Sequence, residues 1–249
     1  GATLDLGTGF SSRQTVASLA GAGTVNFGSA SQLTFGGDNT STSFSGDFSG
    51  GNAALFKQGT GTFTFNGTAS SGRGSFSLDG GTLAMTGFGS LAGLNIGVRN
   101  GAVLDISARV GGVSFASLTF DPGSAVHLGS RTLTVERFDF TFSSHAHGVI
   151  DGTGGLTVGQ NFTLNLYADN TFTGPTTLTT AASAINVRAA NAISASSGVN
   201  LAASGATLNI GAAPADVSIR ALRGFAGRIV TVFNNNLVIT NAASDFAGI

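Results

Sequence analysis

A short phrase returns at nearly constant spacing along this chain, and that repetition restricts the possible folds more than any other feature. It reads GATLDL from Gly1, GGTLAM from Gly80, GAVLDI from Gly101, GSAVHL from Gly123 and GATLNI from Gly205. The third copy begins 21 residues after the second, and the fourth begins 22 residues after the third. Each copy is a turn glycine followed by a short alternating strand, which is typical of a unit that stacks on its own neighbours.

Alternation within each copy assigns every second residue to the core, because successive side chains of a strand point to opposite faces. The expected inward-facing residues are Leu4, Leu6, Leu83, Met85, Leu104, Ile106, Val126, Leu128, Leu208 and Ile210. Similar runs lie between the copies, including TFTF, SFSL, RFDFTF and FTLNLY. Residues 180–203 are rich in alanine, but Asn, Ser and Gly interrupt them, and their INV and GVNL segments are predicted to be strands.

Many short strands fit either a solenoid or a sandwich or barrel, but only a solenoid needs a repeated phrase at constant spacing. We therefore predict an all-β fold, a right-handed parallel β-helix (β-solenoid) with a period of about 21 residues. At that period the 249 residues make about 11 or 12 coils, as one continuous domain over residues 1–249. We also expect like side chains to stack in ladders, Phe on Phe, aliphatic on aliphatic and Asn on Asn.

The composition supports a β fold and excludes several classes of function. The chain has 39 Gly and 20 Phe but no Trp and no Cys, so neither disulfides nor thiol chemistry are available. Hydrophobic residues make up 41%, more than a disordered chain contains. Only 9% of residues are charged and the net charge is −1, which argues against nucleic acid or an anionic membrane surface as a partner.

The sequence lacks the signals of membrane insertion and export. No run of about 18 apolar residues is present, so we expect no transmembrane helix. The first residues, GATLDLG, have neither a basic nor an apolar signal-peptide region, so we expect a mature product or a piece of something longer.

Two stretches of the chain, residues 51–85 and 151–178, carry the strongest family resemblance. The first reads GNAALFKQGTGTFTFNG and, further on, GSFSLDGGTLAM, and it resembles the passenger-associated repeat of bacterial autotransporters (the AIDA-like and pertactin-like β-helices). Leu55, Lys57 and the Gly-Thr-Gly-Thr run match in order, whereas Phe63 and Phe65 stand where leucine is usual. The family's central phrase, Asn-Thr-Tyr-Thr-Gly-Gly-Thr-Thr-Val, is missing there but appears in the second stretch as NTFTGPTTL.

This resemblance implies a passenger segment that is secreted and held at the bacterial cell surface. It implies a longer precursor with a signal peptide and an outer-membrane β-barrel translocator to which the passenger is covalently continuous. It does not specify what the passenger does, because a fold and a repeat do not determine function.

Candidate catalytic residues are sparse. Most acids have Gly, Asn or Pro as neighbours, as turns require: Asp38, Asp47, Asp79, Asp121, Asp151, Asp169 and Asp216. Glu136 and Asp139 lie in a strand-like run, but their spacing places them on opposite faces, which disfavours a catalytic pair from one strand. Partners on neighbouring coils stay open as an alternative. We expect no enzyme activity, no catalytic residue and no cofactor.

Other polar residues have both a structural and a functional interpretation. His145 and His147 share one strand face and would offer two imidazoles to a metal, but an exposed edge or turn is favoured, and no metal site is predicted. GGDN at Asp38 resembles a calcium-binding repeat in a single copy only. Lys57, the only lysine, is expected at a coil corner as a structural or surface residue. Gly59 and Gly61 after it would let the backbone bend into a strand.

Arg220, Arg223 and Arg228 form the one basic cluster, a possible contact patch for an anionic glycan or partner, although a solvated face is the simpler interpretation. The predicted function is a structural passenger or stalk that mediates adhesion, self-association or biofilm formation, with a second copy or a host-cell glycan surface as partner. Two alternatives remain. One is a carbohydrate-active or glycan-binding β-helix, and the other is a scaffold for a toxin or protease domain outside this chain.

Overall fold

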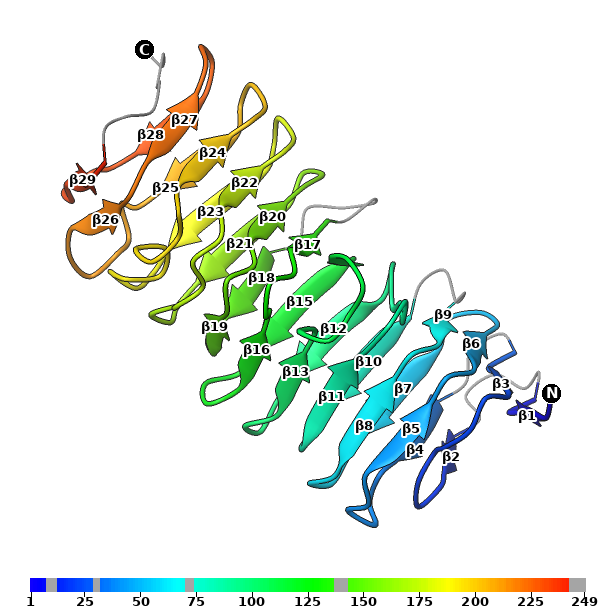
Figure 1. Cartoon of the computed structure of the whole chain (residues 1–249). Helices are drawn as coiled ribbons and strands as arrows, with labels where there is room; N and C mark the ends of the chain where they lie inside the picture. The colour runs from blue at the N-terminus through cyan, green and yellow to red at the C-terminus, as the bar shows by residue number, and fades with distance from the viewer. Residues whose placement is uncertain (8–12, 29–31, 70–73, 137–142, 242–249) are drawn as a thin grey trace. The chain divides into compact units, whose positions relative to one another are not determined.

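The computed structural model describes residues 1–7, 13–28, 32–69, 74–136 and 143–241 (Figure 1). Short parallel β-strands stack in these ranges as a β-solenoid with a period of about 21 residues, and no helix is present in them. The predicted fold class is confirmed. The described turns number about ten, fewer than the 11 or 12 obtained by dividing the whole chain by the period. No helix in the described ranges is long and apolar enough to cross a membrane.

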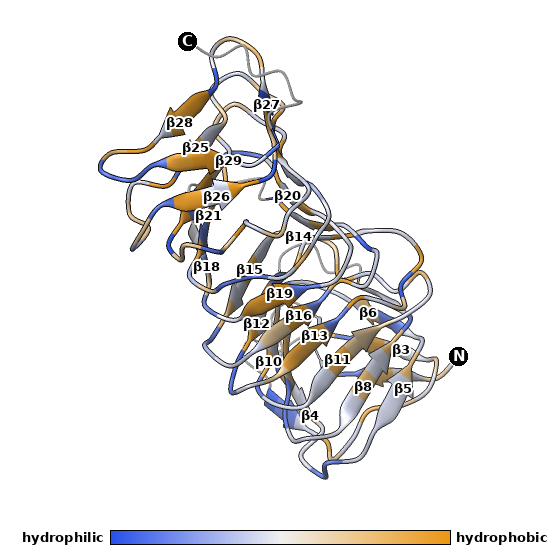
Figure 2. Cartoon of the chain, turned by 60° about the vertical axis from the view of Figure 1, so that its left-hand side comes forward, coloured by the Kyte–Doolittle hydropathy of each residue, from blue (hydrophilic) through white to orange (hydrophobic). Residues whose placement is uncertain are grey.

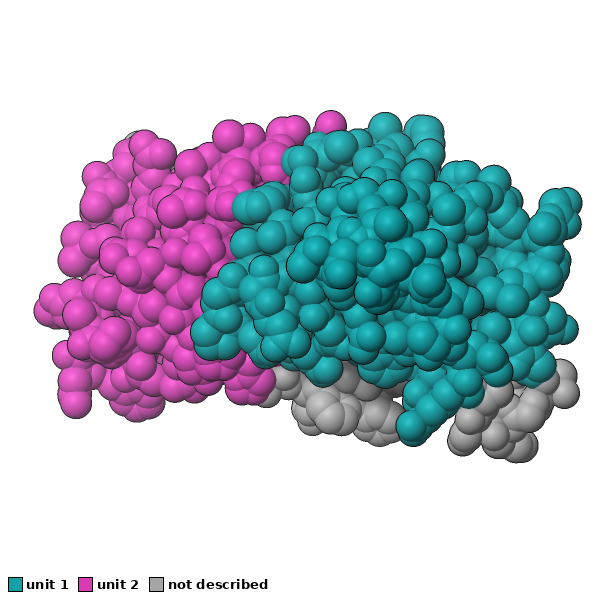
Figure 3. Space-filling model, turned by 90° about the horizontal axis from the view of Figure 1, so that it is seen from below, with its two compact units in different colours: residues 1–127 teal, residues 128–249 magenta. Residues whose placement is uncertain are grey.

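Contacts divide the chain into two compact units, Gly1–His127 (unit 1) and Leu128–Ile249 (unit 2), which are coloured separately in Figure 3. Each unit has its own stacked strands and its own buried apolar residues. The prediction of one continuous domain over residues 1–249 stays a prediction.

Unit 1 has three stacks of parallel strands, each receiving one strand from successive coils. The longest stack runs in the order β2 (Arg13–Thr15), β4 (Gln32–Phe35), β7 (Ala54–Lys57), β10 (Ser75–Leu78), β12 (Asn95–Val98) and β15 (Ser117–Phe120). A second stack runs through β5 (Thr42–Phe44), β8 (Thr62–Phe65), β11 (Thr82–Met85), β13 (Val103–Asp105) and β16 (Ala125–His127). The third contains β1 (Thr3–Asp5), β3 (Thr24–Asn26), β6 (Asp47–Ser49) and β9 (Thr68–Ala69), and β14 (Val113–Phe115) completes the unit.

Unit 2 repeats this plan. One stack runs through β18 (Ser143–Ala146), β21 (Thr163–Leu166), β23 (Ala184–Val187), β25 (Thr207–Asn209) and β28 (Ile229–Thr231). Another runs through β17 (Leu133–Val135), β20 (Leu156–Val158), β22 (Thr176–Leu178), β24 (Val199–Leu201) and β27 (Leu222–Gly224). A smaller stack pairs β26 (Val217–Ile219) with β29 (Leu237–Ile239), and β19 (Val149–Asp151) lies between β18 and β20 in the chain.

Strand register places equivalent residues of successive coils directly above one another. Leu55 of β7 pairs with Phe76 of β10, which pairs with Ile96 of β12, and all three are buried. Because a strand alternates, the residues that follow each of them form a parallel row on the outer face. Figure 2 shows the hydrophobic residues gathered on the strands and many hydrophilic residues in the turns. The solenoid therefore has an apolar interior and regular rows of outer side chains.

The expected core of the repeated phrase is confirmed except at one residue. Nine of the ten predicted inward side chains are buried, from Leu6 at 6% exposed to Met85 and Ile210 at 0%. Leu4, however, is 40% exposed, so the expectation that it is buried is wrong, although it is in register with the buried Val25 of β3. It lies on β1, which ends its stack and pairs on one side only, with β3. A residue of a terminal strand can alternate correctly and still lack a coil to cover it.

Gly59 and Gly61 explain the Gly-Thr-Gly-Thr run that precedes β8. Gly59 has a φ of +72°, and a Cβ there would lie 2.2 Å from the carbonyl oxygen of Gly36. A Cβ on Gly61 would lie 2.2 Å from the carbonyl oxygen of Thr40. Both glycines therefore allow one coil to approach the next more closely than a side chain permits. After this corner Phe63 and Phe65 point inward and Thr62 and Thr64 point outward, as the alternation of the TFTF run indicates.

The predicted phenylalanine ladder exists in unit 1, but not all of its rings stack face to face. Phe44 and Phe65 are register partners with ring centroids 6.4 Å apart and planes inclined by only 15°. Phe48 lies 5.3 Å from Phe65 at 17°. Phe35 meets Phe63 edge-on, at 4.7 Å and 63°. The rings thus fill the interior in both of the arrangements that aromatic pairs prefer.

Candidate functional site

The predicted arginine patch separates into residues with different roles. The guanidinium of Arg228 hydrogen-bonds to backbone carbonyls of this chain. Its Nε donates to the carbonyl of Leu201 at 3.1 Å, and its two terminal nitrogens donate to those of Ala226 and Ala202 at 2.7 and 2.8 Å. Its guanidinium also lies 5.4 Å from the ring centroid of Phe225. Arg228 is therefore a brace between turns, with few donors left for a ligand.

Arg223 is the member of the patch that faces a groove. It occupies the outward position of β27, in register with Asn200 of β24 and Thr177 of β22. This row borders the unit 2 groove, a hollow of about 380 Å³. The Arg223 side chain is exposed and makes no hydrogen bond or ion pair within the described part of the chain. Such a guanidinium beside hydroxyl and amide groups can receive an anionic or polar ligand group. Arg220 is also exposed but does not line the groove.

A second hollow, the unit 1 groove, lies on the outer face of the longest stack of unit 1. Its volume is about 250 Å³. The row that crosses it runs from Phe56 through Ser77 and Gly97 to Thr119, one residue from each of four successive coils. Gly97 contributes no side chain to this row, and Arg99 lies beside it. The groove therefore combines an aromatic ring, hydroxyl groups and one guanidinium.

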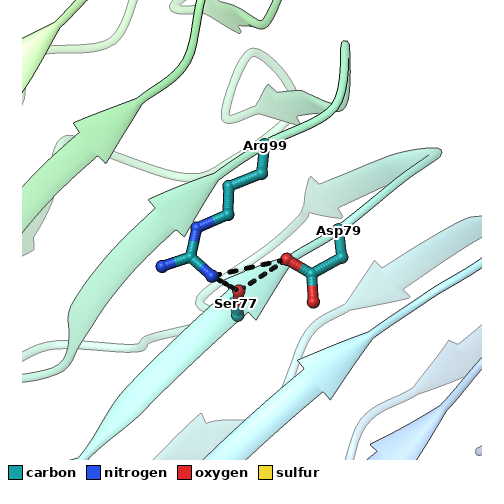
Figure 4. Close-up of polar contacts among 3 residues, drawn as sticks. All are labelled: Ser77, Asp79 and Arg99. Atoms are coloured by element: carbon teal, nitrogen blue, oxygen red, sulfur yellow. Dashed lines mark hydrogen bonds and ion pairs between the residues drawn. The ribbon is translucent and has the colours of Figure 1, made fainter.

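Arg99 is held by two residues of the preceding coil (Figure 4). Its Nη1 donates to the hydroxyl of Ser77 at 3.2 Å and lies 3.8 Å from Oδ1 of Asp79. The Ser77 hydroxyl in turn donates to the same Asp79 oxygen at 2.7 Å. The Arg99 side chain is 52% exposed, so the ion pair itself adds little stability, and its main effect is to orient the guanidinium.

Lys57 is buried rather than superficial. Only 2% of the residue is exposed, and its Nζ donates to three backbone carbonyls, those of Gly59 at 2.9 Å, Gly61 at 2.5 Å and Gly80 at 3.1 Å. Burial lowers the pKa of its ammonium group from the usual value. The expected structural role at a coil corner is confirmed, and the alternative of a surface position is wrong. Because all three ammonium donors have acceptors, Lys57 ties the corner of one coil to the next.

Several acidic residues cap turns, as the sequence indicated. Asp38 accepts from the backbone and hydroxyl of Thr40, at 3.1 and 2.9 Å. Asp216 accepts from the backbone and side-chain nitrogens of Asn236 one coil further on, at 2.8 and 3.0 Å. These hydrogen bonds hold the pKa values of both carboxyl groups below their ordinary range. Glu136 lies within the described residues, whereas Asp139 lies outside them.

His145 lies on β18 and His147 directly follows that strand, and both are exposed, which fits the favoured interpretation of an exposed edge or turn. Their ring centroids are 6.2 Å apart, and Tyr167 of the next coil stacks on His147 at 4.1 Å and 14°. The arrangement is an exposed aromatic platform. Among the described residues no group of three or more His, Cys, Asp or Glu is placed to hold a metal ion.

Sequence reasoning missed the unit 1 groove for an identifiable reason. Phe56, Ser77, Gly97 and Thr119 are 20 to 22 residues apart, and each is unremarkable in its own strand. The signal that could have found them is the register between coils, which aligns Phe56 with Gly97 and so places an aromatic ring near a glycine and the neighbouring Arg99. Arg223, by contrast, was found because its cluster is contiguous in the sequence.

Comparison with known proteins gave no match to a family model, to a curated protein or to a solved structure.

Proposed function

We propose that this chain is a structural passenger segment of an autotransporter-like bacterial surface protein, and that it mediates adhesion or self-association through the outer faces of its coils. In this role it is exported and displayed at the cell surface, and its partners are a second copy of the chain or a glycan surface. The family resemblance of residues 51–85 and 151–178 motivates the export and the location. The outer faces motivate the adhesive role.

The observation that carries this proposal is the chemistry of the outer rows. In unit 2 the Asn186 side chain donates to Oδ1 of Asn165 at 2.9 Å and accepts from Nδ2 of Asn209 at 3.1 Å. A second row passes from Thr134 through Thr157 to Thr177. Up to Thr177 the second row is polar and uncharged, and it continues through Asn200 to Arg223. Another surface can lie along these polar rows with many hydrogen bonds and little charge repulsion.

Display on cells provides the test. Bacteria that carry the chain on an outer-membrane anchor should aggregate, or should bind polysaccharide-coated surfaces, more strongly than bacteria that carry the anchor alone. The variant Thr134→Glu/Thr177→Glu places like charges on the second row and should reduce aggregation several-fold, because charged rows of two copies repel. The matched control is Thr134→Gln/Thr177→Gln, which has the same length without the charge.

The outcomes separate clearly. Displayed cells that stay dispersed and bind no surface contradict the proposal. Equal aggregation of the glutamate and glutamine variants would show that the threonine row does not take part in self-association.

A further inference from the structure

We propose that the unit 1 groove is a binding site for one acidic sugar residue, a pyranose ring that carries a carboxylate. This inference rests on the proposed adhesive function and deepens it by naming the ligand class of one site. Uronic acids and sialic acids share the required chemistry.

The guanidinium of Arg99 offers the carboxylate-binding edge. Its Nη1 is occupied by Ser77 and lies near Asp79, whereas its Nε and Nη2 have no hydrogen-bond acceptor among the described residues. A methyl group built on Gly97 would lie 3.6 Å from Nε and 3.7 Å from Nη2, so the guanidinium lies across the strand above that glycine. Two adjacent N–H donors match the two oxygens of a carboxylate, the bidentate geometry that favours arginine over lysine.

Gly97 creates the space in which the Arg99 guanidinium lies across the floor of the groove. Its backbone is an ordinary strand conformation in β12, and its register partners Ser77 and Thr119 both carry side chains. A glycine in a strand interior weakens the strand, and it often marks a place where another group approaches the backbone closely. With a volume of about 250 Å³ the groove is near the lower limit of ligand pockets, which suits one sugar ring.

The groove walls match the two sides of a sugar ring. The half-buried ring of Phe56 provides an apolar wall against which the C–H face of a pyranose can pack. Across the groove, Ser117 donates to Oδ1 of Asn95 at 2.7 Å, which fixes the amide orientation. The hydroxyls of Ser75 and Thr119 have no hydrogen-bond partner among the described residues and can bond sugar hydroxyls.

The charge balance favours an acidic sugar over a neutral one. Among the described residues that line the groove, Arg99 is the only charged one. Asp79 stands behind the guanidinium, where it orients Nη1 and leaves the Nε–Nη2 edge unoccupied. A neutral sugar would leave that edge without a charged partner, and charge-assisted hydrogen bonds are roughly twice as strong as neutral ones.

Calorimetric titration of the full chain provides the test, with three probes. These are a glucuronic-acid-containing tetrasaccharide, sialyllactose, and the tetrasaccharide after chemical reduction of its carboxylates to alcohols. We expect saturable binding of at least one acidic probe and at least tenfold weaker binding of the reduced one. Preference between the two acidic probes identifies the kind of acid that the groove takes.

Three variants and one control locate the site. Arg99→Gln should weaken binding about tenfold or more, because it removes the charged edge. Gly97→Val should abolish binding while suiting the strand at least as well as glycine, because its side chain would displace the Arg99 guanidinium from the groove. Phe56→Thr should weaken binding through the lost apolar wall. The matched control is Arg13→Gln, which makes the same charge change at an exposed residue of β2 that lines neither groove and should leave binding unchanged. Circular dichroism melts should confirm that each variant folds.

The inference is overturned if no acidic probe binds, if the reduced probe binds equally well, or if folded Gly97→Val binds as the unchanged chain does. Equal weakening by Arg99→Gln and Arg13→Gln would also overturn it, because binding would then follow net charge. Failure here is distinguishable from failure of the proposed function. Aggregation of displayed cells does not require this groove, so it should persist in the Arg99→Gln variant if the adhesive role is correct.

Discussion

The two units build the same solenoid from different side chains. The interior of unit 1 is rich in phenylalanine, with ring pairs such as Phe44–Phe48 at 5.1 Å and Phe48–Phe65 at 5.3 Å. The interior of unit 2 is mainly aliphatic, and the ring contacts found among its described residues lie outside, between His145, His147 and Tyr167. In both units the coils are held at the same strand spacing by parallel backbone hydrogen bonds. The backbone therefore sets the stack, and either kind of apolar ladder can fill it.

The polar side chains that join successive coils by hydrogen bonds differ between the units as well. In unit 1 the ammonium group of Lys57 donates hydrogen bonds to three backbone carbonyls at a coil corner. Unit 2 uses neutral side chains, with Asn165, Asn186 and Asn209 bonded in series. A buried charge is costly to leave unpaired, whereas a half-buried amide costs less. The comparison thus predicts that single substitutions are more damaging in unit 1.

The largest effect is expected from Phe63→Asp in unit 1. It places a carboxylate where a fully buried ring packs 4.7 Å from Phe35, at a cost of more than about 4 kcal/mol. Because solenoid coils contact mainly their neighbours, hydrogen exchange should show unit 1 opening while amides of unit 2 stay protected. An unchanged thermal melt would show that the inward assignment of Phe63 is wrong.

Lys57→Met should follow, with a loss of about 2–4 kcal/mol in urea unfolding. The substitution keeps an unbranched side chain, one atom shorter, but leaves the carbonyls of Gly59, Gly61 and Gly80 without their donor. Gln58→Leu, at the exposed neighbouring residue, is the control and should change stability by less than about 0.5 kcal/mol. If Lys57→Met left the free energy of unfolding unchanged, the expected difference between the Lys57 hydrogen bonds of unit 1 and the asparagine ladder of unit 2 would be wrong.

Asn186→Ala tests the hydrogen-bonded asparagine ladder of unit 2. It interrupts the amide ladder at its middle member and should cost about 1–2 kcal/mol, less than the lysine variant. Asn200→Ala is the matched control, because Asn200 lies in another outer row of unit 2 and its side chain makes no hydrogen bond among the described residues. If both variants unfold at the same urea concentration, the ladder does not stabilise the stack.

A finer measurement compares Phe65→Leu in unit 1 with Phe162→Leu in unit 2. Both rings are fully buried, but Phe65 lies within ring-pair distance of Phe44, Phe48 and Phe63. Phe162 has no such pair among the described residues. The unit 1 variant should therefore lose about 1 kcal/mol more than the unit 2 variant. Equal losses would mean that the rings act only through the area they bury.

The smallest effect concerns pH, and it should appear in both units. Hydrogen bonds lower the pKa values of Asp38 in unit 1 and Asp216 in unit 2 from 3.8. A carboxyl group with a depressed pKa stabilises the fold at pH values above its unfolded pKa, and this contribution is lost as the pH falls through the folded pKa. The melting temperature should therefore decline slightly below about pH 4, and Asp38→Asn/Asp216→Asn should weaken that decline. An identical acid profile would show that these caps do not contribute.

Much of the fold could be predicted from local patterns. Alternation identified inward residues such as Leu83 and Ile210, and glycine spacing identified the corner before β8. The candidate sites were less predictable. Arg223 was noticed because other arginines are close in sequence, yet its row with Asn200 and Thr177 was not. The reason is that coil lengths vary, since Ser75 pairs with Asn95 after 20 residues while Ala184 pairs with Thr207 after 23.

By itself the sequence determined the strand period, the apolar interior and the use of short turns, because these depend on alternation and on glycine at fixed places. Only the tertiary structure decided which residues of different coils meet. It buried Lys57 among carbonyls, left Leu4 exposed at a terminal strand and brought Phe56, Gly97 and Arg99 to one groove. Local patterns act along the chain, whereas a groove on a solenoid forms across it, from residues that the backbone hydrogen bonds align.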